Sequence, residues 1–169
     1  GKKAEILGGL VLIGIGVPLL LGILSGKSVA SVLSFIGSTA ALQPLAAPVG
    51  VILDFDPWLV LAIMTAFAFG ICLGIWEALQ TFALTSERVA GWISRVEEKM
   101  QEHQSLHRYG PVSCILIAWI PGIGLYGTPA IAWILRWKRL PSVLFTVIGF
   151  FLASLLMIVL AEGASSILH

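Results

Sequence analysis

Long apolar stretches dominate the chain, and short polar segments separate them. The first stretch runs from Ile6 to Leu24 and is close to the ~20 residues that a helix needs to cross a bilayer. Two further long apolar helices are predicted after Pro57 and Pro141, because proline suits the first turn of a helix. We therefore predict full transmembrane helices at 6–25, 58–84 and 141–162.

Two other apolar segments contain residues that break helices. Prolines interrupt residues 29–53, and a cluster of prolines and glycines interrupts residues 112–135. Proline lacks an N–H group and clashes with the preceding turn. A broken helix is tolerated at membrane depth only where protein or water covers its free backbone groups. We predict that both segments are re-entrant helical hairpins; for 29–53 the alternative is a kinked but continuous span.

The only strongly charged segment lies between these parts of the chain. Ser86 can cap a helix, and apolar residues recur every three or four positions from Val89 to Met100. We predict an amphipathic helix over 86–107 that lies along the headgroups or packs on the cytoplasmic end of the bundle.

The distribution of basic residues predicts the orientation. With the N-terminus in the cytoplasm and the C-terminus outside, the basic clusters fall on the cytoplasmic side and only Lys27 falls outside. In this topology each half has a hairpin followed by a transmembrane helix, and the halves are inverted. The predicted fold is a single all-α membrane domain in the cell membrane. It comprises this inverted repeat, an extra N-terminal transmembrane helix and the amphipathic helix.

Composition supports a membrane protein. Hydrophobic residues make up 58% of the chain and charged residues 11%, whereas soluble domains carry roughly 25% charged residues. The net charge of +1 does not indicate a nucleic-acid partner. Cys72 and Cys114 lie in apolar segments and are interpreted as packing residues. We expect no metal and no cofactor. An enzyme is disfavoured, because no intramembrane catalytic set, paired-acid metal motif or nucleotide-binding loop is present.

The breaks in the two hairpins are the predicted substrate site. The ends of half-helices expose backbone N–H and C=O groups at membrane depth. Arg136 follows the second hairpin in a basic loop, where it either attracts anionic headgroups or only sets the topology. The residues predicted to bind substrate are Gln43, Pro44, Pro121, Gly122, Gly124, Tyr126, Thr128 and Arg136.

Acidic residues in or near the spans are candidates for proton coupling. Glu77 is the first, because burial of a carboxylate in a span disfavours its charged form; alternatively, it reaches headgroup water from a helix end. Asp54 and Asp56 would bind a proton or cation at the outer mouth of the first hairpin, or serve as a turn and a helix cap. Glu162 is either a coupling residue or an exposed helix-end glutamate.

The second half of the chain, about residues 107–163, contains several characteristic motifs. They are Tyr109-Gly110-Pro111, Ile120-Pro121-Gly122-x-Gly124-x-Tyr126-x-x-x-Ala130 and the basic loop before the last span. In these motifs the chain resembles the small multidrug export family, which is similar to the broader DedA/VTT membrane proteins. The resemblance implies facing re-entrant hairpins and a transport role, either export of small molecules or translocation of a lipid carrier.

The leading functional hypothesis is a proton-coupled secondary transporter or flippase. Its substrate would be a small amphiphilic or lipid-linked molecule bound at the facing hairpin tips. The alternatives are a lipid scramblase that needs no gradient and a membrane assembly factor without transport activity. The expected partners are membrane lipids, protons and the substrate, and the small size makes a homodimer plausible.

Overall fold

The computed structural model describes residues 1–102 and 108–167, and every regular element in these residues is a helix. The predicted amphipathic helix over 86–107 corresponds to α5, and residues 103–107 lie outside the described residues. The elements are α1 (Lys2–Leu24), α2 (Val29–Leu42), η1 (Gln43–Ala46), α3 (Ala47–Ile52), α4 (Pro57–Thr85), α5 (Glu87–Gln101), η2 (Gly110–Val112), α7 (Ser113–Ile117), α8 (Gly124–Ile134) and α9 (Arg139–Ile167).

Four segments of the described residues are long and apolar enough to cross a membrane. They establish an all-α membrane protein, as the sequence predicted, although the prediction counted 29–53 as a hairpin. The segments are Ala4–Leu24, Val29–Ile52, Pro57–Ala83 and Arg139–Ile167.

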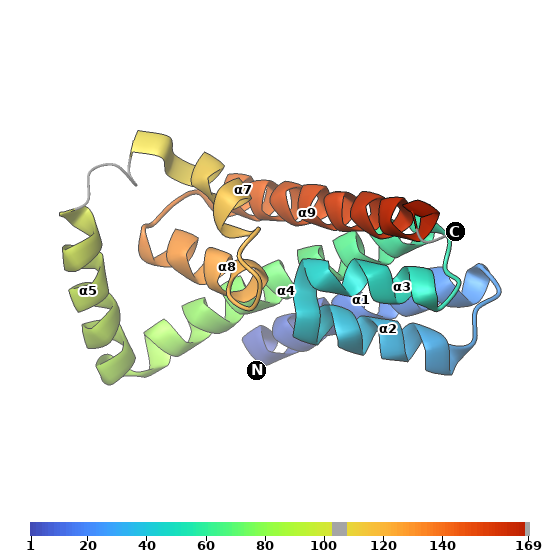
Figure 1. Cartoon of the computed structure of the whole chain (residues 1–169). Helices are drawn as coiled ribbons and strands as arrows, with labels where there is room; N and C mark the ends of the chain where they lie inside the picture. The colour runs from blue at the N-terminus through green and yellow to red at the C-terminus, as the bar shows by residue number, and fades with distance from the viewer. Residues whose placement is uncertain (103–107, 168–169) are drawn as a thin grey trace.

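The second of these segments is broken at Gln43. Proline disfavours helical backbone at the residue before it, and Gln43, which precedes Pro44, has a positive φ of 56°. Beyond the break, α3 lies beside α2 (Figure 1). The Lys27 ammonium donates a hydrogen bond to the backbone carbonyl of Asp54 and lies 5.2 Å from the centre of the Phe55 ring. The chain therefore leaves this pair of helices close to where it entered.

The second broken segment has a comparable form. α7 ends at Ile117, α8 begins at Gly124, and the two helices contact each other. Gly122 in the turn has a φ of +87°, which favours glycine over residues with a side chain. A Cβ on Gly124 would lie 2.5 Å from the carbonyl oxygen of Ala118, so glycine there allows the turn to close tightly.

The long helices α1, α4 and α9 pack against these two helix pairs. Of all the helix pairs, α1 and α4 have the most extensive contact. Gly14 and Gly70 lie where the two helices approach most closely, and because neither has a side chain, the two backbones contact each other directly. The turns at 25–28 and 53–56 lie at the same end of the molecule as the last turn of α9, whereas α5 and the turn at 135–138 lie at the opposite end (Figure 1). The largest fully buried side chains include Phe35, Phe150, Ile63, Met64 and Leu125.

Helix ends differ slightly from the predicted boundaries. α4 begins at Pro57, and the carboxylate of Asp56 accepts a hydrogen bond from the backbone N–H of Trp58 at 2.9 Å. α9 begins at Arg139 rather than 141, because Pro141 is tolerated within the first helical turn. The earlier start places Arg139 on the helix, where it faces α4.

Candidate functional site

The two broken segments meet through the side chain of Gln43. Gln43 is fully buried at the start of η1, and its Oε1 accepts a hydrogen bond from the backbone N–H of Leu125 at 3.3 Å. The first N–H groups of a helix have no partner within the helix, so Gln43 satisfies one at the start of α8. Its Nε2 is buried and has no hydrogen-bond partner among the described residues. The meeting point therefore contains a buried donor that has no partner in the described part of the chain.

A second link between the segments is made by Tyr126. Its hydroxyl donates a hydrogen bond to the backbone carbonyl of Ala40 in the last turn of α2. Thr128 is also buried, but its hydroxyl donates to the carbonyl of Gly124 within α8. Gln43 and Tyr126, two of the predicted binding residues, thus lie at one junction, and Thr128 lies one turn of α8 beyond Gly124 with its hydroxyl already bonded.

A small apolar cavity of about 100 Å³ lies where the two turns meet α9. It brings together Pro44 and Pro121, which the sequence predicted as parts of one site. Its volume suits a small group of a ligand rather than a whole drug-sized molecule. The lining residues are Pro44, Leu45, Trp119, Pro121, Ala153, Leu156 and Met157.

Three of the predicted acidic residues lie at the end of the molecule that contains the turns at 25–28 and 53–56. These residues have structural roles or are exposed. Asp56 caps α4, and Asp54 has a positive φ of 63° in the turn where its carbonyl accepts from Lys27. Glu162 is exposed in the last turns of α9. A part for these carboxylates in proton coupling remains a prediction.

Glu77 forms an ion pair that joins α4 to α9. Its Oε1 lies 2.6 Å from Nη1 of Arg139, and the side chains are 19% and 35% exposed. Ionisable groups in membrane spans commonly pair with one another. The sequence predicted a basic loop before the last span, but it did not predict that Arg139 at the end of this loop pairs with Glu77. The available signal was that Glu77 and the loop were both predicted near the cytoplasmic face.

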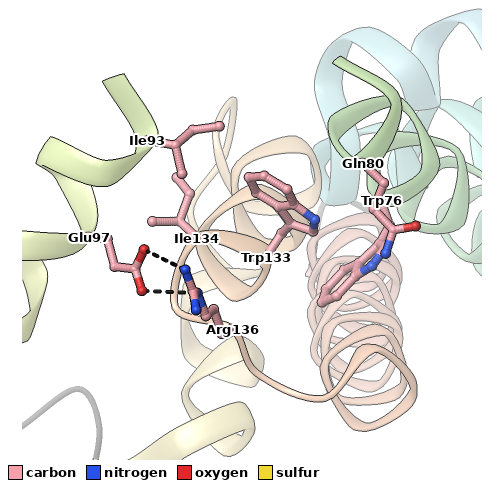
Figure 2. A pocket seen from close by; sticks show the side chains of 7 residues that line it. All are labelled: Trp76, Gln80, Ile93, Glu97, Trp133, Ile134 and Arg136. Atoms are coloured by element: carbon pink, nitrogen blue, oxygen red, sulfur yellow. Dashed lines mark hydrogen bonds and ion pairs between the residues drawn. The ribbon is translucent and has the colours of Figure 1, made fainter. Parts of the chain in front are cut away.

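Arg136 lies at the opposite end of α8 from the junction around Gln43. Its guanidinium pairs with Glu97 of α5, with Nε 3.1 Å from Oε1 (Figure 2). The two residues border a cavity of about 280 Å³ between α4, α5 and α8. The sequence analysis did not predict this cavity, because its walls come from three segments that are distant in the chain. The cavity is lined by Trp76, Gln80, Ile93, Glu97, Trp133, Ile134 and Arg136.

The described residues contain no group of three His, Cys, Asp or Glu side chains that could hold a metal ion. Cys72 and Cys114 are buried free thiols.

Comparison with known families places the chain. Residues 44–156, about two thirds of its length, match the family described as "Putative small multi-drug export protein". The chain belongs to this family. Searches of curated proteins and of solved structures found no significant match. The match begins at Pro44, directly after the break at Gln43, and ends within α9. The relationship to DedA/VTT proteins stays a prediction from the sequence.

Proposed function

We propose that this member of the small multi-drug export family is a proton-coupled secondary transporter of small amphiphilic molecules. In this proposal α2–η1–α3 and α7–α8 are re-entrant hairpins of an inverted repeat, and substrate binds where their tips meet. The N-terminus and α5 lie on the cytoplasmic side, and the C-terminus lies outside. Glu77 carries the coupled proton.

The observation that carries the proposal is the buried amide of Gln43 between the two tips. Oε1 of this amide accepts a hydrogen bond from the backbone N–H of Leu125, whereas Nε2 has no protein partner in the described part of the chain. A buried donor without a partner costs free energy, on the order of 1–3 kcal/mol. A substrate oxygen or a water molecule bound at the tips would recover that cost.

The position of each chain reversal supports the hairpin topology. The first pair returns to Lys27 at one end of the molecule, and the second pair has its open end beside α5 at the other. The tips meet through Tyr126 and Ala40 between these ends. Opposed broken helices that meet in this way form the central binding sites of many secondary transporters.

A transport assay with tip variants tests the proposal. In proteoliposomes with an imposed pH gradient, uptake of the fluorescent cation ethidium should fall at least about tenfold in Gln43→Met, because the amide loses both of its hydrogen-bonding groups. Leu42→Met, a neighbouring substitution on an exposed side chain, is the control and should transport at the wild-type rate. Equal rates of ethidium uptake in Gln43→Met and Leu42→Met would show that the hairpin tips do not take part in transport.

The same vesicles separate the transporter from a scramblase. A scramblase equilibrates a fluorescent phospholipid between leaflets without a gradient, whereas the proposed transporter moves its substrate only when a gradient is present. Rapid lipid equilibration without a gradient, combined with ethidium uptake that ignores the gradient, would favour the scramblase.

Cysteine accessibility tests the topology independently of any substrate. Single cysteines at Lys27, Asp54 and Lys138 would be placed in a background without Cys72 and Cys114. We expect the cysteines at 27 and 54 to react with an impermeant maleimide from outside, and the cysteine at 138 from the cytoplasmic side. Cysteines at 43 and 126 should react slowly, because both side chains lie at the junction. Labelling of 27 and 54 from opposite sides would show that 29–53 crosses the membrane.

A further inference from the structure

The cavity between α4, α5 and α8 is separate from the hairpin tips. It lies beside Arg136, at the far end of α8 from Gly124, so the length of that helix separates it from the Gln43 amide. Its volume of about 280 Å³ is close to the lower end of the range for small-molecule sites. Its place beside α5 puts it on the cytoplasmic side of the proposed topology.

Tryptophan side chains form much of the wall. Trp76 of α4 is only 4% exposed, and Trp133 of α8 is half-buried, with Ile134 beside it (Figure 2). The indole N–H of Trp76 has no hydrogen-bond partner in the residues that the structure describes. Indole faces attract organic cations through the ring quadrupole. The buried N–H offers a donor to a ligand oxygen or to a water molecule that accompanies it.

An acid and a base line the cavity, and the acid is the more buried of the two. The Glu97 side chain is 18% exposed, whereas its partner Arg136 is 80% exposed. An ion pair with so exposed a partner contributes little to stability, so a ligand cation can replace the guanidinium at low cost. Glu97 would then neutralise the cation, and Arg136 would move into solvent.

We infer that this cavity is a binding site for a small hydrophobic organic cation, whose charge lies between the tryptophan faces and the Glu97 carboxylate. The inference deepens the proposed transport function by naming an access site on the cytoplasmic side and a ligand class, and it rests on that function for its biological role. The binding step itself can be measured without transport.

Equilibrium binding to the full chain in detergent tests the inference. The probe is benzyltrimethylammonium, with benzenesulfonate as an anion of similar size, and binding is measured by calorimetry. The wild-type protein should bind the cation more tightly than the anion. Absence of cation binding, or tighter binding of benzenesulfonate, would overturn the inference.

Substitutions in the wall should weaken cation binding selectively. Glu97→Gln and Trp133→Leu should each raise Kd roughly tenfold, whereas Trp133→Phe keeps an aromatic face and should lose less. Matched controls on α5 are Glu98→Gln and Trp92→Leu, which change exposed side chains outside the cavity lining. Melting temperatures verify that every variant is folded. Equal effects of wall and control variants would contradict the inference.

Arg136→Ala distinguishes the two signs of ligand. If the ligand is a cation, removing the competing guanidinium should lower Kd several-fold; if Arg136 itself held an anion, the same change would weaken binding. Gln43→Met separates this inference from the proposed function. Loss of cation binding in Gln43→Met, with wild-type binding in Glu97→Gln, would place the cation at the tips and overturn the inference alone. The reverse result would support the cavity, and the tips would then be tested by the transport assay with Gln43→Met alone.

Discussion

Replacing Gly70 with alanine is expected to lower the melting temperature of the purified protein by roughly 5 °C, because a methyl group at this position meets the backbone of α1. A Cβ on Gly70 would collide with the Cα of Gly14, and a Cβ on Gly14 would lie 3.2 Å from the Cα of Gly70. Backbone cannot move aside as a flexible side chain can. The helices must therefore separate along their contact, and small residues are what allow such close packing between membrane helices.

Gly74→Ala is the matched control for Gly70→Ala. It lies one turn further along α4 and is also buried, but a Cβ there would find its nearest atom, in Val11, at 3.9 Å. That is ordinary contact, so Gly74→Ala should melt at or slightly above the wild-type temperature, since alanine favours helix more than glycine does. The measurement is thermal unfolding in detergent, followed by size-exclusion chromatography. Equal melting temperatures for the two variants would show that the α1–α4 contact does not limit stability.

The contact between α1 and α4 also shows which features of the fold can be predicted from the sequence and which cannot. The apolar lengths were sufficient to predict the long helices, because each must cover the thickness of a bilayer. The breaks at Gln43 and Gly122 were also visible, since proline and glycine act on local backbone. The pairing of Gly14 with Gly70 was not visible, because it depends on how two distant helices cross.

The candidate site was predictable to a similar extent. Gln43 and Tyr126 are predictable as site residues because each polar group lies beside a helix break, and the structure brings both to one junction. Their partners, the N–H of Leu125 and the carbonyl of Ala40, are backbone groups that carry no sequence signal. The cavity around Trp76 is not predictable from the sequence, because its walls come from three segments that are distant in the chain.

The ion pair between Glu77 and Arg139 provides a structural basis for the proposed proton coupling. The pair links α4 to the first turn of α9, which directly follows the loop after α8. Protonation of Glu77 would remove the charge that holds Arg139. The start of α9 could then shift relative to α4, and the shift would reach the tip of the second pair through α8.

Glu77→Gln is therefore expected to reduce gradient-driven ethidium uptake to the rate measured without a gradient, because the side chain can no longer exchange a proton. The variant leaves Arg139 without its partner, so some loss of stability is expected as well. The double variant Glu77→Gln/Arg139→Gln removes both charges and should recover most of that stability but none of the gradient-driven uptake. Glu5→Gln, an exposed acid in the first turn of α1, is the control. If uptake returned together with stability in the double variant, the pair would be a structural link, and the coupling proton would have to be carried elsewhere.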